Sequence, residues 1–295
     1  MKYSLFTVSV PELTLEEALE KIKKLGYDGV DFRVAQLPKD DVISEEKPSY
    51  WRNNRCTVDL DAIEEKAVEI RRLADQYGME INCLATYLCC SDSSEKIESC
   101  MRAAQVMGCG KIRVNTPGYD KGKGYRELFA ESVRGLERVE KLSGKYRIKA
   151  DFEMHMGNIT ASASAARNLA SWFDPAYIGV IYDTGNVIYE GFEEYQMAFE
   201  ILGPYLDLVH VKNAKWSRAK EDGKEKYLPG WAALKDGFAD FERCFQALKA
   251  CGYDGYITFE DFSDNEGPDQ KLRNNIHYIK KIVDDVYGRR EEEYE

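Results

Sequence analysis

The sequence predicts an α/β protein folded as a (β/α)8 barrel of parallel strands, the TIM-barrel architecture. Strand-like apolar runs alternate with helix-like amphipathic segments eight times along the 295 residues. The connections between them are too short to hold a second domain, and barrels of this kind occupy about 250 residues. We therefore expect a single barrel domain over residues 1–290, followed by an acidic tail at 291–295.

The first strand–helix–strand unit shows the pattern clearly. Residues 2–8 are rich in aromatic and β-branched side chains, as strands are. Thr14 and Glu17 have the spacing of a capping box at the start of a helix, and Gly26 is placed to end that helix. Residues 29–33 form the next strand. This unit predicts a parallel pair of strands joined by a right-handed crossover.

The rest of the chain repeats this alternation. The further predicted strands are 79–84, 111–114, 149–153, 178–182, 206–211 and 255–259, and the further predicted helices are 61–77, 95–107, 125–142, 161–173, 193–202, 240–251 and 269–287. Two polar segments interrupt it, 34–59 and 212–237. The first is too long for a simple connection, and we expect it to cover a site.

Sequence motifs and composition argue against several classes of protein. No Gly-x-Gly-x-x-Gly follows the first strand and no Gly-x-x-x-x-Gly-Lys-Ser/Thr occurs, which removes the main support for a dinucleotide or P-loop site. The formal net charge of −11 argues against nucleic-acid binding. Neither an export signal nor an apolar run of about 20 residues is present, so we expect a cytoplasmic protein without a membrane partner.

The eight cysteines are expected to be reduced thiols in such a compartment. Only Cys89 and Cys90 are close together, and they are adjacent rather than in a Cys-x-x-Cys spacing. This spacing argues against a structural zinc site.

Four consecutive predicted strands end in residues able to hold a hard metal ion, namely Glu153, Asp183, His210 and Glu260. The active sites of such barrels lie at the carboxyl ends of the strands, and neighbouring strands are about 4.8 Å apart. Three carboxylates and one imidazole suit Mn²⁺, Mg²⁺ or Co²⁺, with Zn²⁺ as a further candidate. The alternative is that the acids cap the following helices and His210 is an ordinary histidine of the barrel rim.

These strand ends resemble a known family, the xylose isomerase-like barrels, which include ketose 3-epimerases, hydroxypyruvate isomerases and inosose dehydratases. The motifs that carry the resemblance are Asp-Phe-Glu153-Met-His155, Asp183-Thr-Gly-Asn186, His210-Val-Lys-Asn213 and the segment 250–260 that closes with Glu260. The resemblance implies that the four strand-end residues bind one divalent metal ion. It also implies that Glu153 and Glu260 are the catalytic acid/base pair, that the substrate is a small-molecule sugar, and that a homodimer or homotetramer is plausible.

The function expected from these residues is a metal-dependent isomerase or epimerase acting on a sugar or sugar phosphate. A divalent ion can stabilise the enediolate formed when a carbon next to a carbonyl loses its proton. Two carboxylates on opposite faces would invert that carbon, whereas one base would move the proton to the neighbouring carbon. Loss of a β-hydroxyl group would instead make the protein a lyase, either an inosose-type dehydratase or a keto-sugar eliminase.

A non-catalytic sugar-binding barrel is the alternative from another class. Asn186 and Asn213 stand where many relatives carry His and Asp, and an amide cannot act as an acid or a base.

Six residues are candidates for substrate binding: Phe6, Trp51, Asn115, His155, Asn186 and Lys212. His155 shares a strand face with Glu153 and could bind substrate or orient that carboxylate. Lys212 could hold an oxyanion, although a solvated loop lysine is the simpler expectation. Trp51 could stack on a sugar ring or simply pack within its loop, and Trp231 in the second polar segment could do the same. Phe6 and Asn115 could line the pocket or belong to the core.

Overall fold

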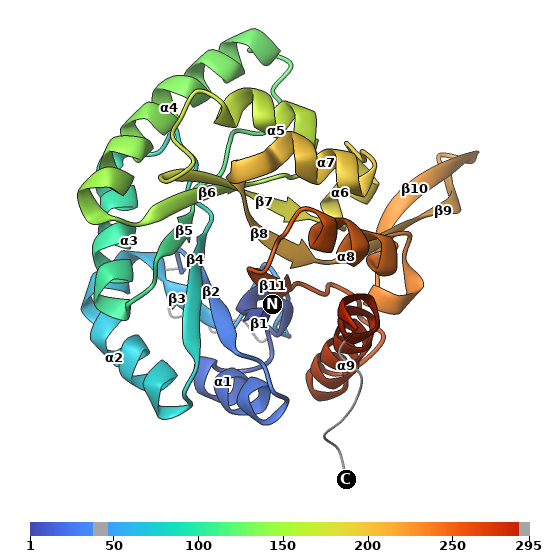
Figure 1. Ribbon diagram of the computed structural model, residues 1–295, viewed down its shortest axis with the longest axis horizontal. Helices are drawn as coiled ribbons and strands as arrows, with labels where there is room; N and C mark the ends of the chain where they lie inside the picture. The colour runs from blue at the N-terminus through green and yellow to red at the C-terminus, as the bar shows by residue number, and fades with distance from the viewer. Residues whose placement is uncertain (38–46, 289–295) are drawn as a thin grey trace.

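A closed barrel of eight parallel strands forms the centre of the computed structural model, which describes residues 1–37 and 47–288 (Figure 1). In spatial order the strands are β1 (Lys2–Phe6), β2 (Gly29–Ala35), β4 (Glu80–Thr86), β5 (Lys111–Arg113), β6 (Lys149–Glu153), β7 (Ile178–Asp183), β8 (Leu206–Val211) and β11 (Tyr256–Phe259). The barrel closes because β1 pairs with both β2 and β11. A short strand, β3 (Thr57–Asp59), pairs with the carboxyl end of β2, beyond the residues of β2 that pair with β1. The predicted fold class is confirmed.

The helices lie outside the barrel, between successive strands (Figure 1). They are α1 (Leu15–Lys24), α2 (Ile63–Gln76), α3 (Ser94–Met107), α4 (Tyr125–Tyr146), α5 (Ala163–Ala170), α6 (Asn186–Tyr189), α7 (Tyr195–Leu202), α8 (Phe241–Ala250) and α9 (Pro268–Tyr287). No helix among the described residues is long and apolar enough to cross a membrane. The predicted tail at 291–295 lies outside the described residues, as does the part of the first polar segment at 38–46.

Most element boundaries differ from the sequence prediction by a few residues, and one short helix was not predicted. β1 ends at Phe6 rather than residue 8, because Thr7–Ser9 form a 3-10 turn. α4 continues to Tyr146, four residues beyond the predicted end. The short helix α6 was not predicted. It begins at Asn186, where the backbone N–H of that residue donates to Asp183 Oδ1.

The capping box of α1 is confirmed. Thr14 Oγ1 accepts a hydrogen bond from the backbone N–H of Glu17, and Glu17 Oε2 accepts one from the backbone N–H of Thr14. The chain then leaves the helix through Gly26, whose φ of +78° is in the left-handed region. These contacts satisfy two backbone donors that the first turn would otherwise leave unpaired.

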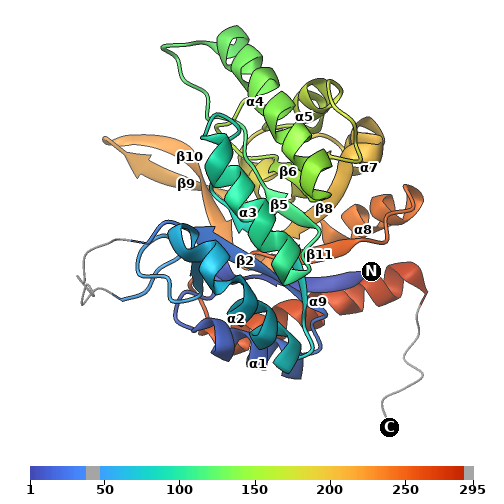
Figure 2. The ribbon, with the colours of Figure 1, turned by 90° about the vertical axis from the view of Figure 1, so that its left-hand side faces the viewer.

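The second polar segment forms a two-stranded antiparallel hairpin of β9 (Asn213–Glu221) and β10 (Lys224–Ala232). Asp222 and Gly223 make the turn with φ values of 51° and 74°, as a type I′ turn requires. Figure 2 shows that the hairpin projects from the barrel on the side opposite the N-terminus. The Asp-Gly pair in the sequence is the signal that could have predicted the hairpin.

A second group of charged side chains lies inside the barrel, at the end opposite the four strand-end residues. Near the amino ends of the strands, Lys111 Nζ and Lys149 Nζ each lie 2.6 Å from an oxygen of Asp207. Asp151 is fully buried next to this group. Gly179, on the neighbouring strand, leaves the room that these side chains occupy, because a Cβ atom there would lie 2.1 Å from Asp151 Oδ1.

We predict that Gly179→Ala destabilises the protein by about 1–3 kcal/mol or more, as overpacking of a filled interior does. The added methyl group would also lie 2.7 Å from Lys149 Cε and 2.9 Å from Asp207 Cβ. Denaturant unfolding monitored by circular dichroism measures the change. Gly110→Ala is the matched control, because its Cβ would meet no atom within 4 Å. Equal stability of the two variants would contradict the packing described here.

Candidate metal and substrate site

Four of the predicted residues converge at the carboxyl ends of the strands. One ligand atom from each of Glu153, Asp183, His210 and Glu260 lies within 4.8 Å of the other three, and all four side chains are buried. Strand order explains the convergence, since Asp183 on β7 pairs in register with His210 on β8, and Glu260 directly follows β11. His210 Nδ1 lies 3.6 Å from Glu153 Oε1 and 3.4 Å from Glu260 Oε2. Such a cluster could bind a divalent metal ion.

Two buried cations balance the carboxylates. Arg113 Nη1, at the end of β5, lies 2.6 Å from Glu153 Oε2. Lys212 Nζ lies 2.9 Å from Asp183 Oδ2 and 2.9 Å from Glu260 Oε2. With His210 neutral, three carboxylates and two cations leave one excess negative charge. In the metal-free protein a protonated His210 balances that charge, and a divalent ion that displaces the His210 proton would take over this role.

Lys212 is not the solvated loop lysine that was the simpler expectation, since its side chain is only 2% exposed. Its Nζ also lies over two aromatic rings, 4.8 Å from the centroid of Trp231 and 5.1 Å from that of Phe262. These cation–π contacts hold the ammonium group at the edge of the cluster.

The electrostatic environment shifts the pKa of each group in the cluster. Burial disfavours every charged form, but the nearby Arg113 guanidinium holds the pKa of Glu153 well below its usual range. Lys212 similarly lowers the pKa of Glu260 to about 2. For His210, the neighbouring Glu153 and Glu260 outweigh burial and raise the pKa to about 10. Burial raises the pKa of Asp183 in spite of Lys212.

A cavity of about 90 Å³ opens next to the cluster. Among its walls are the predicted residues Trp51, Asn115, His155 and Lys212, together with Glu153 and Glu260. Most of the remaining wall is aromatic, from Tyr87, Trp231 and Phe262. An aromatic wall and a polar floor form the kind of pocket that binds a polyhydroxylated ring.

The other two substrate-binding candidates lie behind this cavity. Phe6 is fully buried, with its ring centroid 5.8 Å from that of His210. Asn186 is also fully buried, and its Nδ2 donates to Glu153 Oε1 at 3.2 Å and to Met154 O at 3.1 Å. In this arrangement both residues contact members of the cluster.

Asn213 is removed from the cavity as well. Its side chain donates to Leu234 O at 2.6 Å and accepts from the backbone N–H of Ala239 at 2.8 Å. These bonds join the base of the hairpin to the segment before α8.

Sequence reasoning missed three residues of this region. Arg113 is the last residue of β5, Tyr87 directly follows β4, and Phe262 comes just after β11. The Tyr87 ring lies 4.9 Å from the Arg113 guanidinium carbon and 5.2 Å from that of Arg33. The position of Arg113 at a strand end, like the four cluster residues, is the signal that could have found it.

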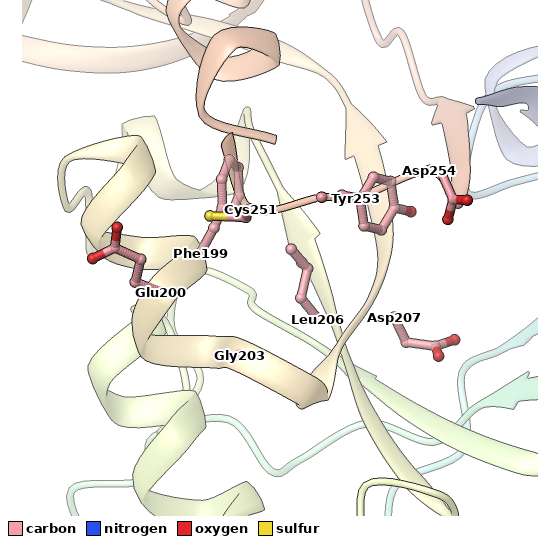
Figure 3. Close-up of a pocket in the computed structure, with 10 residues that line it drawn as sticks. Phe199, Glu200, Gly203, Leu206, Asp207, Cys251, Tyr253 and Asp254 are labelled. Atoms are coloured by element: carbon pink, nitrogen blue, oxygen red, sulfur yellow. The ribbon is translucent and has the colours of Figure 1, made fainter. Parts of the chain in front are cut away.

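A larger cavity, about 530 Å³, lies at the opposite end of the barrel (Figure 3). Its lining includes Leu206, where β8 begins, and Gly255, just before β11. Glu200, Asp207 and Cys251 also border it. Because it lies at the amino ends of the strands, it is distant from the cluster, and size alone does not identify the site.

Comparison of the chain with protein families matches residues 19–282 to the model described as the xylose isomerase-like TIM barrel. An inosose dehydratase of Bacillus licheniformis is 26% identical over 296 aligned residues, which cover 93% of this chain and 90% of that protein. An inosose dehydratase of Bacillus velezensis is 30% identical over 141 residues, 44% of this chain and 46% of that protein.

Solved structures share the fold at low sequence identity. The 3-keto-D-glucoside 4-epimerase of E. coli superposes with a TM-score of 0.70 at 16% identity, covering 95% of this chain and 99% of that one. The D-psicose 3-epimerase of Clostridium cellulolyticum H10 superposes with a TM-score of 0.70 at 13% identity, covering 96% and 99%. The match over most of its length shows that this chain belongs to the xylose isomerase-like TIM-barrel family.

Proposed function

We propose that this protein is a divalent-metal-dependent isomerase or epimerase acting on a sugar or sugar phosphate through an enediolate intermediate. The observation that carries the proposal is the buried Glu153, Asp183, His210 and Glu260 cluster facing a cavity with aromatic walls. The hard oxygen ligands favour Mn²⁺, Mg²⁺ or Co²⁺, with Zn²⁺ as a further candidate. When bound, the ion supplies a Lewis acid that stabilises negative charge on the substrate oxygens.

The residues of the chain divide the remaining work. Asp183 and His210 hold the ion, together with the two glutamates. Glu153 and Glu260 both reach the cavity, and they flank His210 from different strands. One carboxylate can remove the proton next to the substrate carbonyl, while the other relays a proton from water to the opposite face. Arg113 keeps Glu153 ionised and therefore ready to act as the base.

The remaining cavity residues serve to bind and orient the substrate. Lys212 presents an ammonium group that can donate to a substrate oxygen. Trp51 and Trp231 offer apolar faces to the sugar ring, and Asn115 offers an amide. The Asn115 Oδ1 atom is buried without a hydrogen-bond partner among the described residues, so a substrate hydroxyl group would satisfy it.

A lyase is the second candidate, and His155 is the observation that favours it. His155 lines the same cavity as Glu153, and its Nδ1 lies 2.7 Å from the carbonyl oxygen of Met156. In the neutral ring this contact places the proton on Nδ1 and leaves Nε2 free to accept a proton. A histidine beside Glu153 gives the second acid/base group that loss of a β-hydroxyl needs. The relatives named inosose dehydratase support the same alternative.

Product mass separates the two reactions. The protein, purified without chelator and supplied with Mn²⁺, is incubated with a panel of ketoses, sugar phosphates and inososes, and products are measured by mass spectrometry. Epimerisation and isomerisation preserve the substrate mass, whereas dehydration removes one water. Exchange of solvent deuterium into recovered substrate detects enediolate formation in either case. A protein that binds metal and sugar but catalyses no exchange would be a non-catalytic binding barrel.

We predict that Glu153→Gln and Glu260→Gln each lower kcat by about 10²–10⁴-fold, because each removes one proton-transfer group. The amide keeps the size of the side chain, so the circular dichroism spectrum should remain that of the wild type. Glu200→Gln, in the distant cavity of Figure 3, is the matched control and should retain full activity. Retention of wild-type kcat in either glutamate variant would contradict the proposed acid/base pair.

We predict that metal binding near pH 7.5 releases at least about one proton per ion, because His210 must lose its proton to become a ligand. Its pKa of about 10 in the metal-free protein means that the ring is protonated at that pH. Metal affinity should therefore rise about tenfold per pH unit between pH 7 and 9 and fall as the pH is lowered. Calorimetry in two buffers with different ionisation enthalpies counts the released protons. Binding with no proton release would show that His210 is not a ligand.

A further inference from the structure

We propose that Asp31 is a positioning residue that fixes the ring of His210, so that Nδ1 faces the metal position and the ring proton stays on Nε2. The inference rests on the proposed function, since it concerns how this chain prepares one of its ligands. Asp31 lies in the middle of β2 and is fully buried.

The Asp31 carboxylate accepts hydrogen bonds from side chains on three other strands of the barrel. Its Oδ1 accepts hydrogen bonds from Ser4 Oγ at 2.5 Å and from Asn82 Nδ2 at 2.8 Å. Its Oδ2 accepts one from Thr258 Oγ1 at 3.1 Å. The three donors belong to β1, β4 and β11, so the carboxylate has a fixed place inside the barrel. Burial raises the pKa of Asp31, and the three donated hydrogen bonds act in the opposite direction by stabilising its charged form.

The two nitrogen atoms of His210 face different partners. Nδ1 faces the ligand cluster, with Glu153, Asp183 and Glu260 between 3.4 and 3.9 Å away. Nε2 faces Asp31 Oδ2 at 4.0 Å. Within residues 1–37 and 47–288, Asp31 is the one acid that forms an ion pair with Nε2.

The chemistry of a histidine ligand explains what Asp31 does. A neutral imidazole has one proton, and the nitrogen that binds a metal must be the one without it. A carboxylate behind the ring favours the tautomer whose proton points toward it, and it makes the other nitrogen a stronger ligand. A shift of about 1 Å from the separation of 4.0 Å would bring Nε2 and Oδ2 within hydrogen-bond distance. Asp31 therefore selects Nδ1 as the ligand atom.

A purely structural carboxylate would behave differently. It would affect the free energy of unfolding when removed, but it would leave the tautomer of His210 and the metal affinity of the folded protein unchanged. Asp151 offers this comparison within the same chain. It is also fully buried in the barrel, its two carboxylate oxygens have no hydrogen-bond partner among the described residues, and no ion pair there joins it to His210.

The test compares the wild type, Asp31→Asn and Asp151→Asn by two measurements that do not depend on activity. Affinity for Zn²⁺ and Mn²⁺ is measured by competition with a chelating dye, after circular dichroism has confirmed folding. The tautomer of His210 is read from a long-range ¹H–¹⁵N spectrum of the Zn²⁺-loaded protein, which is simple because the chain has only three histidines.

The expected result is a loss of about 10–100-fold in metal affinity for Asp31→Asn, as for other residues that support a metal-bound histidine. The wild-type spectrum should show His210 bound through Nδ1 and protonated at Nε2, with the Nε2 proton exchanging faster in Asp31→Asn. Asp151→Asn should bind metal within about twofold of the wild type. Equal affinity and an unchanged His210 signal in Asp31→Asn would overturn the inference while the proposed function stands.

Other outcomes are equally decisive. A wild type that binds neither ion would overturn the proposed function and the inference with it. If Asp31→Asn does not fold, Thr258→Val replaces it, because this change removes one hydrogen bond to the same carboxylate and keeps the side-chain shape. Thr258→Val should then lower the affinity by a few-fold, and an unchanged affinity in that variant would overturn the inference.

Discussion

The arrangement of the site depends on how buried negative charge is balanced at the carboxyl ends of the barrel strands. Three carboxylates lie within a few ångströms of one another and of His210, and burial disfavours the charged form of each. Arg113 and Lys212 make this possible, because each places a full positive charge against a cluster carboxylate. Cation–π contacts also fix the positions of both side chains, since Arg113 lies over Phe6 and Lys212 lies over Trp231. Arg113 and Lys212 thus nearly balance the three carboxylates, and the remaining positive charge comes from a protonated His210 or from a bound cation that replaces its proton.

The same principle applies through the depth of the barrel. Asp31, in the middle, is held by hydroxyl and amide donors, and Asp207, at the amino ends, is held by Lys111 and Lys149. Asp151 is the exception, and burial with the nearby Asp207 charge raises its pKa well above the usual range. Polar groups at successive levels restrict how the strands can shift relative to one another, because a displaced strand would leave buried charges unpaired.

The sequence predicted the fold and the four cluster residues because both depend on local patterns. Alternating apolar periodicities define the strands and helices, and parallel closure then brings the strand ends together, so Glu153, Asp183, His210 and Glu260 had to meet. The environment of Lys212 could not be predicted in this way. Whether a residue just after a strand points into solvent or into the mouth depends on the loops that cover it, here those of Trp231 and Phe262. Asp31 was missed for a related reason, since a charged residue in mid-strand reveals its role only when the opposite strands are known.

The hairpin β9–β10 has a fixed base and an independent tip. Asn213 and the Trp216 indole, which donates to Ile188 O at 2.8 Å, attach the base to the barrel beside Lys212. The far end is braced by its own ion pairs, such as Lys226 with Glu221, and none of the ion pairs among the described residues joins it to the barrel. Changes in the length or sequence of the tip would therefore leave Trp231 and the cluster in place. Natural variation could alter what approaches the mouth of this barrel by remodelling the tip, without any change to the buried cluster.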